Sequence, residues 1–331
     1  MGLLLARQAT ATSPANKGGA RLPGANKFEP GQELSGSYSK PWLDESTVGA
    51  VDAALLDVFP TVPSKSELWE PGLLPLNCAK YHATFPSLSP GFNFSVYNVT
   101  YNDCDSPWVF CRHADAHRSI EDMTDMFGRL PIRMRELIRT VVAIPDAAPE
   151  DDGWDALSTE SDIVVRPTGW ELRVLAHEAS HILDSHYADR TSRPHYNGPQ
   201  AAPVGGGGIR RWLRRHTRDW LGLRKLGGGG TLYSATARWR EAEQRDAAVV
   251  TSYSLTSWVE HFAEMAGPGL LEAARGPGAV AALVGRDVAE KLRSQIAVWA
   301  QDWGFVASGG GLKCDERERP DPAEVIHNDF F

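Results

Sequence analysis

The sequence predicts an α+β fold that is mostly helical and carries a small mixed sheet. Residues 92–101 and 108–111 are dense in aromatic and β-branched side chains, which is typical of strands. From residue 171 onward, most apolar residues recur at helical spacing. The chain has 331 residues, 42% of them hydrophobic and 23% charged, which suits a globular protein of one large domain or two ordinary ones.

The first part of the chain has little regular pattern. Residues 1–40 are rich in Ala, Gly, Ser, Pro and Lys without periodicity, and we expect a disordered leader or propeptide there. Residues 41–90 place apolar residues between prolines, which predicts one short helix within irregular structure. Residues 92–101 and 108–111 then predict the two strands of a hairpin-like unit.

Two helices and a strand are predicted after the hairpin. Ser119, with Asp122 three residues later, has the pattern of a capping box that starts a helix. Pro131 suits the first turn of a second helix, which must end before Pro145. The apolar residues of this second helix are Ile132, Met134, Leu137, Ile138 and Val141. Residues 161–166 predict a short strand.

Residues 205–230 begin and end with runs of four glycines that enclose a basic segment. Ile209, Trp212, Leu213, His216 and Trp220 fall at helical spacing there, which is the pattern of a basic amphipathic helix on flexible tethers. One interpretation is a mobile lid or a surface anchor. The others are a low-complexity insertion without a role and retained intron sequence.

The last third of the chain predicts helices separated by Gly and Pro. The predicted helical segments are residues 235–250, 255–266, 270–274, 280–284 and 288–303. Beyond residue 308 the chain is glycine-rich and then charged, so we expect an extended tail over residues 309–331.

Charge and sequence signals restrict the class of protein. The net charge of −8 argues against nucleic acid as a general partner. No run approaches 18 apolar residues, so we expect no transmembrane helix. Glycosylation sequons begin at Asn93 and Asn98. Together with an even number of cysteines, they favour a secreted, extracellular glycoprotein, with the cell wall as one location, which we expect to be a monomer.

The four cysteines favour disulfides over a metal site, because none of them forms a C-x-x-C pair. Four cysteines allow three pairings. We expect Cys104–Cys111 to close a short loop and Cys78–Cys314 to tie the early chain to the late chain. Four free thiols in a cytosolic protein are the alternative.

Residues 171–187 contain the motif H-E-x-x-H, formed by His177, Glu178 and His181. On a helix, residues four positions apart lie about 40° apart, so both imidazoles can reach one metal ion. The apolar residues Leu172, Leu175, Ala176, Ala179, Ile182 and Leu183 form a stripe roughly opposite to the histidines. This pattern predicts a buried helix that presents two zinc ligands and a carboxylate to a cleft.

A catalytic zinc usually takes three protein ligands, and the candidate for the third is a Glu on a later helix. Glu260 and Glu264 lie opposite an apolar stripe of Leu255, Trp258, Val259 and Phe262. Two other interpretations are that both carboxylates face water, or that Ser257 and Glu260 form a capping box.

The motif H-E-x-x-H-x-x-D at residues 177–184, together with Y-x6-E-x-F-A-E at residues 253–264, resembles the gluzincin peptidases of the lethal-factor type. The resemblance implies that Glu260 completes the zinc site and that Tyr253 stabilises the tetrahedral intermediate. It also implies a zincin-like metallopeptidase domain, which we expect over residues 41–308.

The wider chain is similar to fungal conidiation-specific secreted proteins over about residues 70–300. The segments that carry this similarity are V-Y-N-V-T-Y-N-D-C at 96–104, P-W-V-F-C-R-H at 107–113 and L-P-I-R-M-R at 130–135. One departure from the peptidase pattern is Ser180, which replaces the glycine of the common H-E-x-G-H motif.

The resulting hypothesis is a secreted zinc metalloprotease, a hydrolase that cleaves a protein or peptide substrate. Zn²⁺ would be bound by the two histidines and Glu260, with Glu178 as general base and Tyr253 stabilising the oxyanion. Asp184 or Glu264 would orient a ligand histidine. The alternative for Asp184 is an acid on the surface of the helix. The alternatives are a non-catalytic secreted zinc-binding or cell-wall protein, and an interaction protein in which the motif is a relic.

Overall fold

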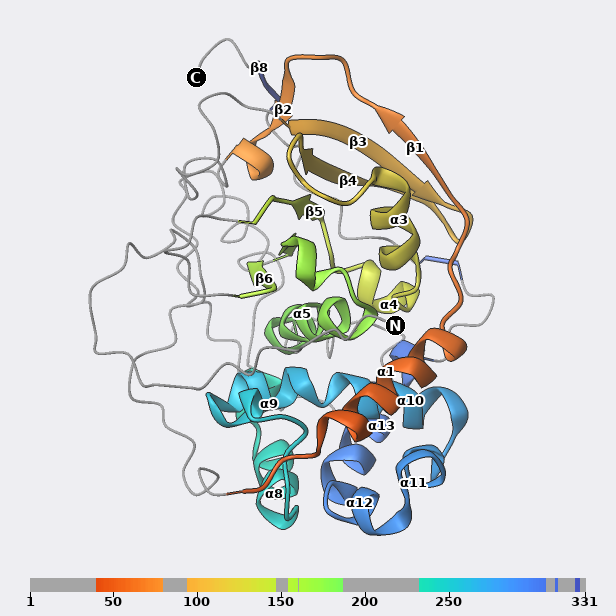
Figure 1. Ribbon diagram of the computed structural model, residues 1–331, viewed down its shortest axis with the longest axis vertical. Coiled ribbons are helices and arrows are strands. Elements are labelled where there is room, and N and C mark those ends of the chain that lie inside the picture. The colour runs from red at the N-terminus through yellow and green to blue at the C-terminus, as the bar shows by residue number, and fades with distance from the viewer. Residues whose placement is uncertain are drawn as a thin grey trace, which may run out of the picture.

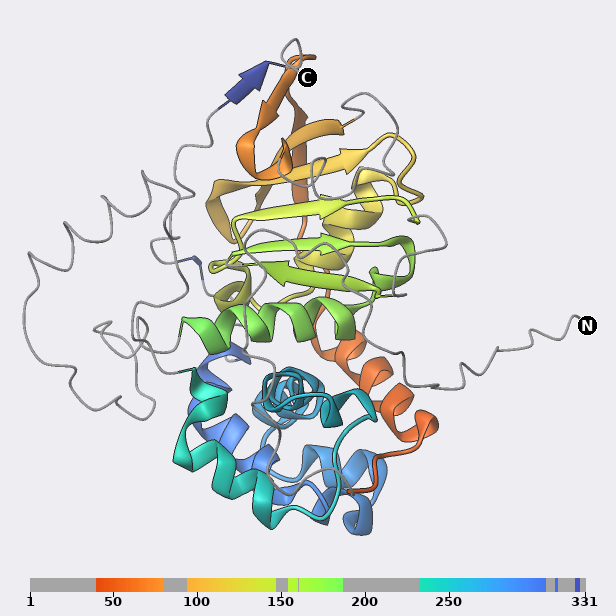
Figure 2. The same ribbon diagram turned by 90° about the vertical axis from the view of Figure 1, so that its left-hand side faces the viewer.

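The computed structural model divides into a sheet layer and a helix layer. It describes residues 40–79, 94–146, 154–159, 161–186, 232–307, 313–314 and 325–327. The sheet occupies the upper half of the molecule, and most helices lie below it (Figure 1). Helix α5 (Leu172–Ser185) runs between the two layers, as the side view shows (Figure 2). This helix carries the H-E-x-x-H motif, so the motif lies at the junction of the layers.

The main sheet is mixed and has the strand order β1-β3-β4-β5-β7-β6. Its strands are β1 (Ser64–Leu68), β3 (Phe94–Tyr101), β4 (Cys104–His113), β5 (Thr140–Ala143), β6 (Ala156–Thr159) and β7 (Asp162–Val165). Strands β4, β5 and β7 are parallel, and the other neighbours are antiparallel. A second, two-stranded sheet pairs β2 (Leu73–Pro75) with β8 (Val325–His327).

The predicted hairpin is confirmed, with Tyr101 opposite Cys104 and a tight turn between β3 and β4. Alternating side chains of the sheet point to two apolar clusters. Val99 and Phe110 face the helices, while Val96 and Cys111 face the opposite side. The sheet is therefore buried on both faces near its centre, and the helix-facing side joins the core around α5.

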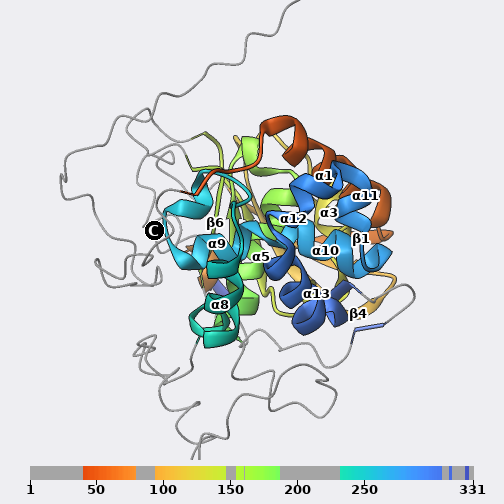
Figure 3. The same ribbon diagram turned by 90° about the horizontal axis from the view of Figure 1, so that it is seen from below.

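Helices form most of the remaining described structure. The α-helices with their bounds are α1 (Glu45–Val58), α3 (Ile120–Gly128), α4 (Ile132–Arg135), α5, α8 (Ala237–Arg245), α9 (Trp258–Glu264), α10 (Ala266–Arg275), α11 (Ala279–Val284), α12 (Arg286–Glu290) and α13 (Arg293–Ala307). Short 3₁₀ helices are η1 (Pro167–Gly169), η2 (Tyr233–Ala235) and η3 (Tyr253–Leu255). Seen from below, α8 to α13 gather beneath α5 (Figure 3).

The two helices predicted after the hairpin have different outcomes. The capping box of Ser119 and Asp122 is confirmed at the start of α3. The helix predicted after Pro131 is wrong in its length, because it ends at Arg135, and Val141 lies in β5 instead. The run around Val141 is short and apolar, a pattern that periodicity alone cannot assign to helix or strand. Pairing of β5 with β4 on one side and β7 on the other decides for the strand.

Two of the late helices, α8 and α9, are shorter than predicted, whereas α10 and α11 extend beyond the predicted segments 270–274 and 280–284. The segment 235–250 is helical only in α8, after which the Asp246 side chain accepts hydrogen bonds of 2.8 Å from the backbone N–H groups of Ser294 and Gln295 at the start of α13. The segment 255–266 begins with irregular chain before α9. The backbone of Asp246 is extended, and its side chain binds the start of another helix, a long-range contact that local periodicity does not reveal.

The predicted disulfide pairing is wrong. The bonds are Cys78–Cys111 and Cys104–Cys314, with Cα–Cα distances of 6.3 and 5.0 Å. Cys104 and Cys111 both lie on β4, seven residues apart, so an extended strand separates them by about 23 Å. An odd spacing also places them on opposite faces of the sheet. Each therefore pairs with a partner from another part of the chain, and no cysteine is free.

Other expectations lie wholly or largely outside the described residues. These are the leader at 1–40, the sequon at Asn93, the insertion at 205–230 and most of the tail at 309–331. Asn98 lies on β3 and is partly exposed. Within the described ranges, no helix is long and apolar enough to cross a membrane.

Candidate metal centre

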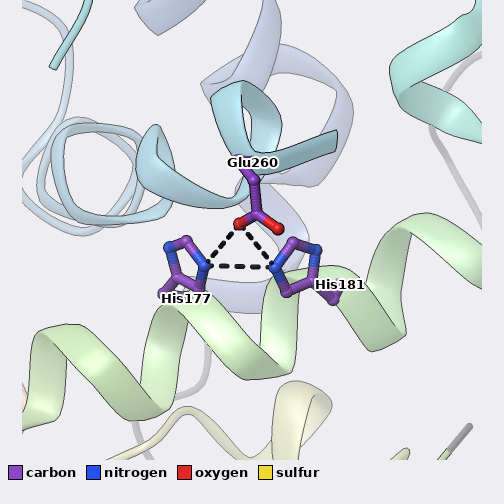
Figure 4. Close-up of side chains that lie close together, drawn as sticks. All are labelled: His177, His181 and Glu260. Atoms are coloured by element: carbon purple, nitrogen blue, oxygen red, sulfur yellow. Dashed lines mark hydrogen bonds and ion pairs between the residues drawn. The ribbon is translucent and has the colours of Figure 1, made fainter. Parts of the chain in front are cut away.

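Helix α5 places His177 and His181 one turn apart on the side that faces α9 (Figure 4). The apolar residues Leu175, Ala179 and Ile182 of the same helix are buried in the core. Because these residues fix the rotation of α5, both imidazoles point in one direction. His177 is buried, and His181 is partly exposed.

Helix α9 presents the third side chain. Ser257 caps this helix, since its Oγ accepts a hydrogen bond of 3.2 Å from the backbone N–H of Glu260. Phe262 and Ala263 are fully buried behind the helix. The carboxylate of Glu260 is directed to the histidines of α5 (Figure 4). The capping bond and the ligand position are therefore compatible, although the sequence presented them as alternatives.

Three candidate ligand atoms converge. The Nε2 atoms of His177 and His181 are 3.1 Å apart, and each lies 3.0 Å from Oε2 of Glu260. In a tetrahedral zinc site with bonds of about 2.0–2.1 Å, neighbouring donor atoms are about 3.3 Å apart. Two imidazoles and one carboxylate that leave a fourth position open are the donor set of catalytic zinc sites. The residues therefore fit a zinc ion after outward shifts of a few tenths of an ångström.

Glu264 contacts the other nitrogen of His177. Its Oε1 lies 2.8 Å from His177 Nδ1, and its Oε2 accepts a hydrogen bond of 2.7 Å from the hydroxyl of Thr251. A carboxylate on Nδ1 fixes the orientation of the imidazole and leaves Nε2 for a metal. Glu264 thus occupies the place that the sequence suggested for a residue orienting a ligand histidine.

Asp184 has a different set of contacts. Its two carboxylate oxygens accept hydrogen bonds from the backbone N–H and the hydroxyl of Ser234, at 2.7 and 2.6 Å. Burial raises the pKa of Asp184 to about 6, although the bonds from Ser234 oppose this shift. Asp184 therefore joins the end of α5 to the chain segment that precedes α8, and its hydrogen bonds hold Ser234.

Glu178 and Tyr253 complete the predicted set. Glu178 follows His177 on α5 and is buried. The ring of Tyr253 lies 5.9 Å from the ring of His177, measured between centroids, and half of the residue is exposed. Partial burial and the neighbouring carboxylates of Glu260 and Glu178 raise the pKa of Tyr253, so its hydroxyl keeps its proton.

The metal-free cluster holds an extra proton. Burial by itself disfavours a charged imidazole, but hydrogen bonds to Glu260 and Glu264 outweigh it and raise the pKa of His177 to about 10. The same contacts with the histidines overcome the opposing effect of burial and lower the pKa values of both carboxyl groups. His177 is therefore positively charged between two carboxylates at neutral pH.

Two residues near the site were not predicted from the sequence, namely Thr251 and Ser234. Thr251 acts through one hydroxyl contact to Glu264, 13 positions away, and Ser234 through an amide and a hydroxyl contact to Asp184, 50 positions away. No motif signals such contacts, because they depend on how α5, α9 and the preceding loops pack. The strand predicted at 161–166 is confirmed as β7, but the edge of the sheet next to α5 is β6.

Comparison with known proteins gives one family. The family model described as "Conidiation-specific protein Con-13" matches residues 47–273. The chain is 24% identical over 218 residues to "Conidiation-specific protein 13" of Neurospora crassa, which covers 65% of this chain and 50% of that protein. The chain thus spans about half the length of this curated relative. No solved structure matches the chain significantly.

Proposed function

The chain belongs to the Con-13 family of conidiation-specific proteins, and we propose that it acts as a secreted zinc-dependent metalloendopeptidase with a zincin-like fold. The observation that carries this proposal is the convergence of two Nε2 atoms and one carboxylate oxygen within 3.1 Å of one another. A second carboxylate, that of Glu178, stands next to a ligand on the same helix. A site that only holds metal has no need of this acid.

Each residue of the site has a role in the proposed reaction. Zinc bound to the three ligands would supply a Lewis acid that lowers the pKa of coordinated water toward ~7. Glu178 accepts the proton of the attacking water and passes it to the leaving amine. Tyr253, which keeps its proton, donates a hydrogen bond to the carbonyl oxygen as negative charge develops there. Glu264 holds the ring of His177 in place.

Strand β6 supports an extended peptide as the substrate. It is the last strand of the described sheet on the side of α5, and it packs against that helix. An exposed strand edge can bind an extended peptide through main-chain hydrogen bonds. The start of β6 is fixed by the residue that precedes η1, since Arg166 N–H donates to Asp155 O at 2.9 Å. Gly169 allows this approach, because a Cβ there would lie 2.3 Å from Asp155 O.

Removal of the metal tests the proposed function. The purified protein should contain about one zinc per chain and cleave an unfolded protein such as casein. Dialysis against a chelator should abolish cleavage, and about one equivalent of zinc should restore it. Zinc without cleavage would support the non-catalytic secreted alternative. A protein without zinc that also fails to bind added zinc would contradict both.

Zinc binding is expected to release about one proton. His177 is charged in the metal-free site because its pKa is raised to about 10, and a ligand must lose its proton to bind metal. The apparent zinc affinity should therefore rise about tenfold per pH unit between about pH 7 and about pH 9. The measurement is calorimetric titration in two buffers of different ionisation enthalpy at each pH.

The stability of the metal-free protein should follow the same proton. A raised pKa of His177 contributes stability that is complete below about pH 6.5, the unfolded value, and is lost as the pH rises through about 10. Zinc-loaded protein should lack this decline, because its imidazole carries no proton. If zinc binding releases almost no protons at pH 7, His177 is not charged in the metal-free site.

A further inference from the structure

The turn that carries Tyr253 is fixed on the side that precedes it. Val249 and Val250 are buried, and their backbone pairs with residues 41–43 through the hydrogen bonds Val249 N–H to Pro41 O and Leu43 N–H to Val249 O, at 2.9 and 3.2 Å. Ser254 is fully buried and donates its backbone N–H to Thr251 O at 3.2 Å. Thr251 therefore stands between a fixed strand-like segment and the turn of η3.

Thr251 also contacts the metal centre through one carboxylate. Its hydroxyl donates to Oε2 of Glu264 at 2.7 Å, and Oε1 of the same carboxylate lies 2.8 Å from Nδ1 of His177. The side chain of Glu264 is only 6% exposed, so water contributes little to holding it. Two partners, one on each oxygen, define the position of this carboxylate.

These contacts link Thr251 to Tyr253 by way of the metal centre. Thr251 connects to Glu264, Glu264 connects to His177, and the ring of His177 lies against the ring of Tyr253, two residues along the chain from Thr251. Loss of the Thr251 hydroxyl would leave Oε2 of Glu264 without this partner and would remove the side-chain link between Glu264 and the segment that carries Tyr253.

We propose that Thr251 is a positioning residue of the metal centre, which couples zinc binding at His177 to the placement of Tyr253. This inference rests on the proposed function for its catalytic consequence. Its effect on zinc affinity can be measured without any cleavage. Thr251 contacts neither zinc nor substrate in this role, and it acts through Glu264.

The test compares zinc affinities, measured by competition with a chromophoric chelator. Thr251→Val keeps the shape of the side chain and removes the hydroxyl, so zinc should bind about tenfold more weakly, as is typical when a partner of a metal ligand is lost. Thr251→Ser should restore binding to within about twofold of the wild type. Thr256→Val is the matched control, because the Thr256 hydroxyl donates to Tyr253 O at 2.7 Å in the same turn, and no contact between it and Glu264 occurs among the described residues.

A second arm asks whether Thr251 acts through Glu264. In the Glu264→Gln background, Thr251→Val should weaken zinc binding by less than about twofold, because the link from Thr251 through the Glu264 carboxylate to His177 is already lost. At saturating zinc, Thr251→Val should also lower kcat for a peptide substrate, and it should do so much less in the Tyr253→Phe background. Both results would show that Thr251 positions other side chains of the site, because a general loss of stability would produce neither of them.

Three outcomes would overturn the inference: wild-type zinc affinity in Thr251→Val, tenfold weaker binding in a folded Thr251→Ser variant, or full additivity with Glu264→Gln. Zinc binding and peptide cleavage by the wild-type protein test the proposed function separately. If it binds zinc and cleaves nothing, the peptidase proposal fails while the affinity comparison still decides the role of Thr251.

Discussion

Replacement of Glu178 by Gln is expected to lower kcat by about a thousandfold while zinc content stays at the wild-type level. The amide has the shape of the carboxylate but cannot accept a proton, and general base catalysis typically contributes 10²–10⁴-fold. Glu178 is not among the three converging ligand atoms, so the metal should remain. The measurements are kcat for a fluorogenic peptide and zinc per chain by atomic emission on the same sample.

The control for this variant lies at the start of the same helix. Glu171 stands at the position that precedes α5, makes no capping bond, and its side chain is 61% exposed. Glu171→Gln removes the same charge and should leave kcat within about twofold of the wild type. If Glu178→Gln retains more than about a tenth of wild-type activity, another group accepts the proton and the assignment of the base is wrong.

The candidate site divides into a part that local pattern predicts and a part that it does not. The spacing of His177 and His181 is a property of one helix, so 3.6-residue periodicity and the apolar stripe of α5 were sufficient to predict that both rings share a face. Glu260 lies 79 residues beyond His181. The apolar stripe of its own segment made Glu260 and Glu264 candidates, and family resemblance chose Glu260, because no local rule connects residues so far apart. The structure brings its carboxylate to the two rings.

Errors in the fold prediction have the same origin. The assignment of Val141 to a helix failed because a short apolar run fits a buried helix or a buried strand, and the neighbours β4 and β7 decide between them. The pairing of Cys104 with Cys111 failed because β4 extends through both cysteines. Strand length depends on pairing with other strands, so it is known only once the sheet is assembled. Thr251 and Ser234 were missed because their contacts with Glu264 and Asp184 also form only when distant parts of the chain pack together.

Loss of the Cys104–Cys314 disulfide is expected to lower the free energy of unfolding by about 5 kcal/mol. The bond closes 210 residues of chain, and in the chain-entropy model a loop of this length reduces the entropy of the unfolded state by that amount at 25 °C. The Cys78–Cys111 bond closes only 33 residues, which corresponds to about 4 kcal/mol. Denaturant unfolding of the double Ser variants, without zinc, measures both losses.

The native structure around Cys104 has support that does not depend on the disulfide. The turn between β3 and β4 is held by an ion pair between Asp103 and Arg135, whose Nε also donates to Leu130 O at 2.9 Å. The guanidinium lies 4.7 Å from the ring centroid of Tyr101, which adds a cation–π contact. Removal of the bond should therefore act on the unfolded chain and leave this turn intact.

Zinc affinity and the unfolding midpoint together test the disulfide prediction. Neither Cys104 nor Cys314 contacts the metal ligands, so the Cys104→Ser/Cys314→Ser variant should bind zinc with wild-type affinity while its unfolding midpoint falls. The Cys78→Ser/Cys111→Ser variant should show the smaller loss of stability. A loss below about 1 kcal/mol for the longer loop would mean that the unfolded chain is already compact between these cysteines. Weakened zinc binding would instead mean that the tail supports the metal centre, because a purely entropic link cannot alter ligands that remain folded.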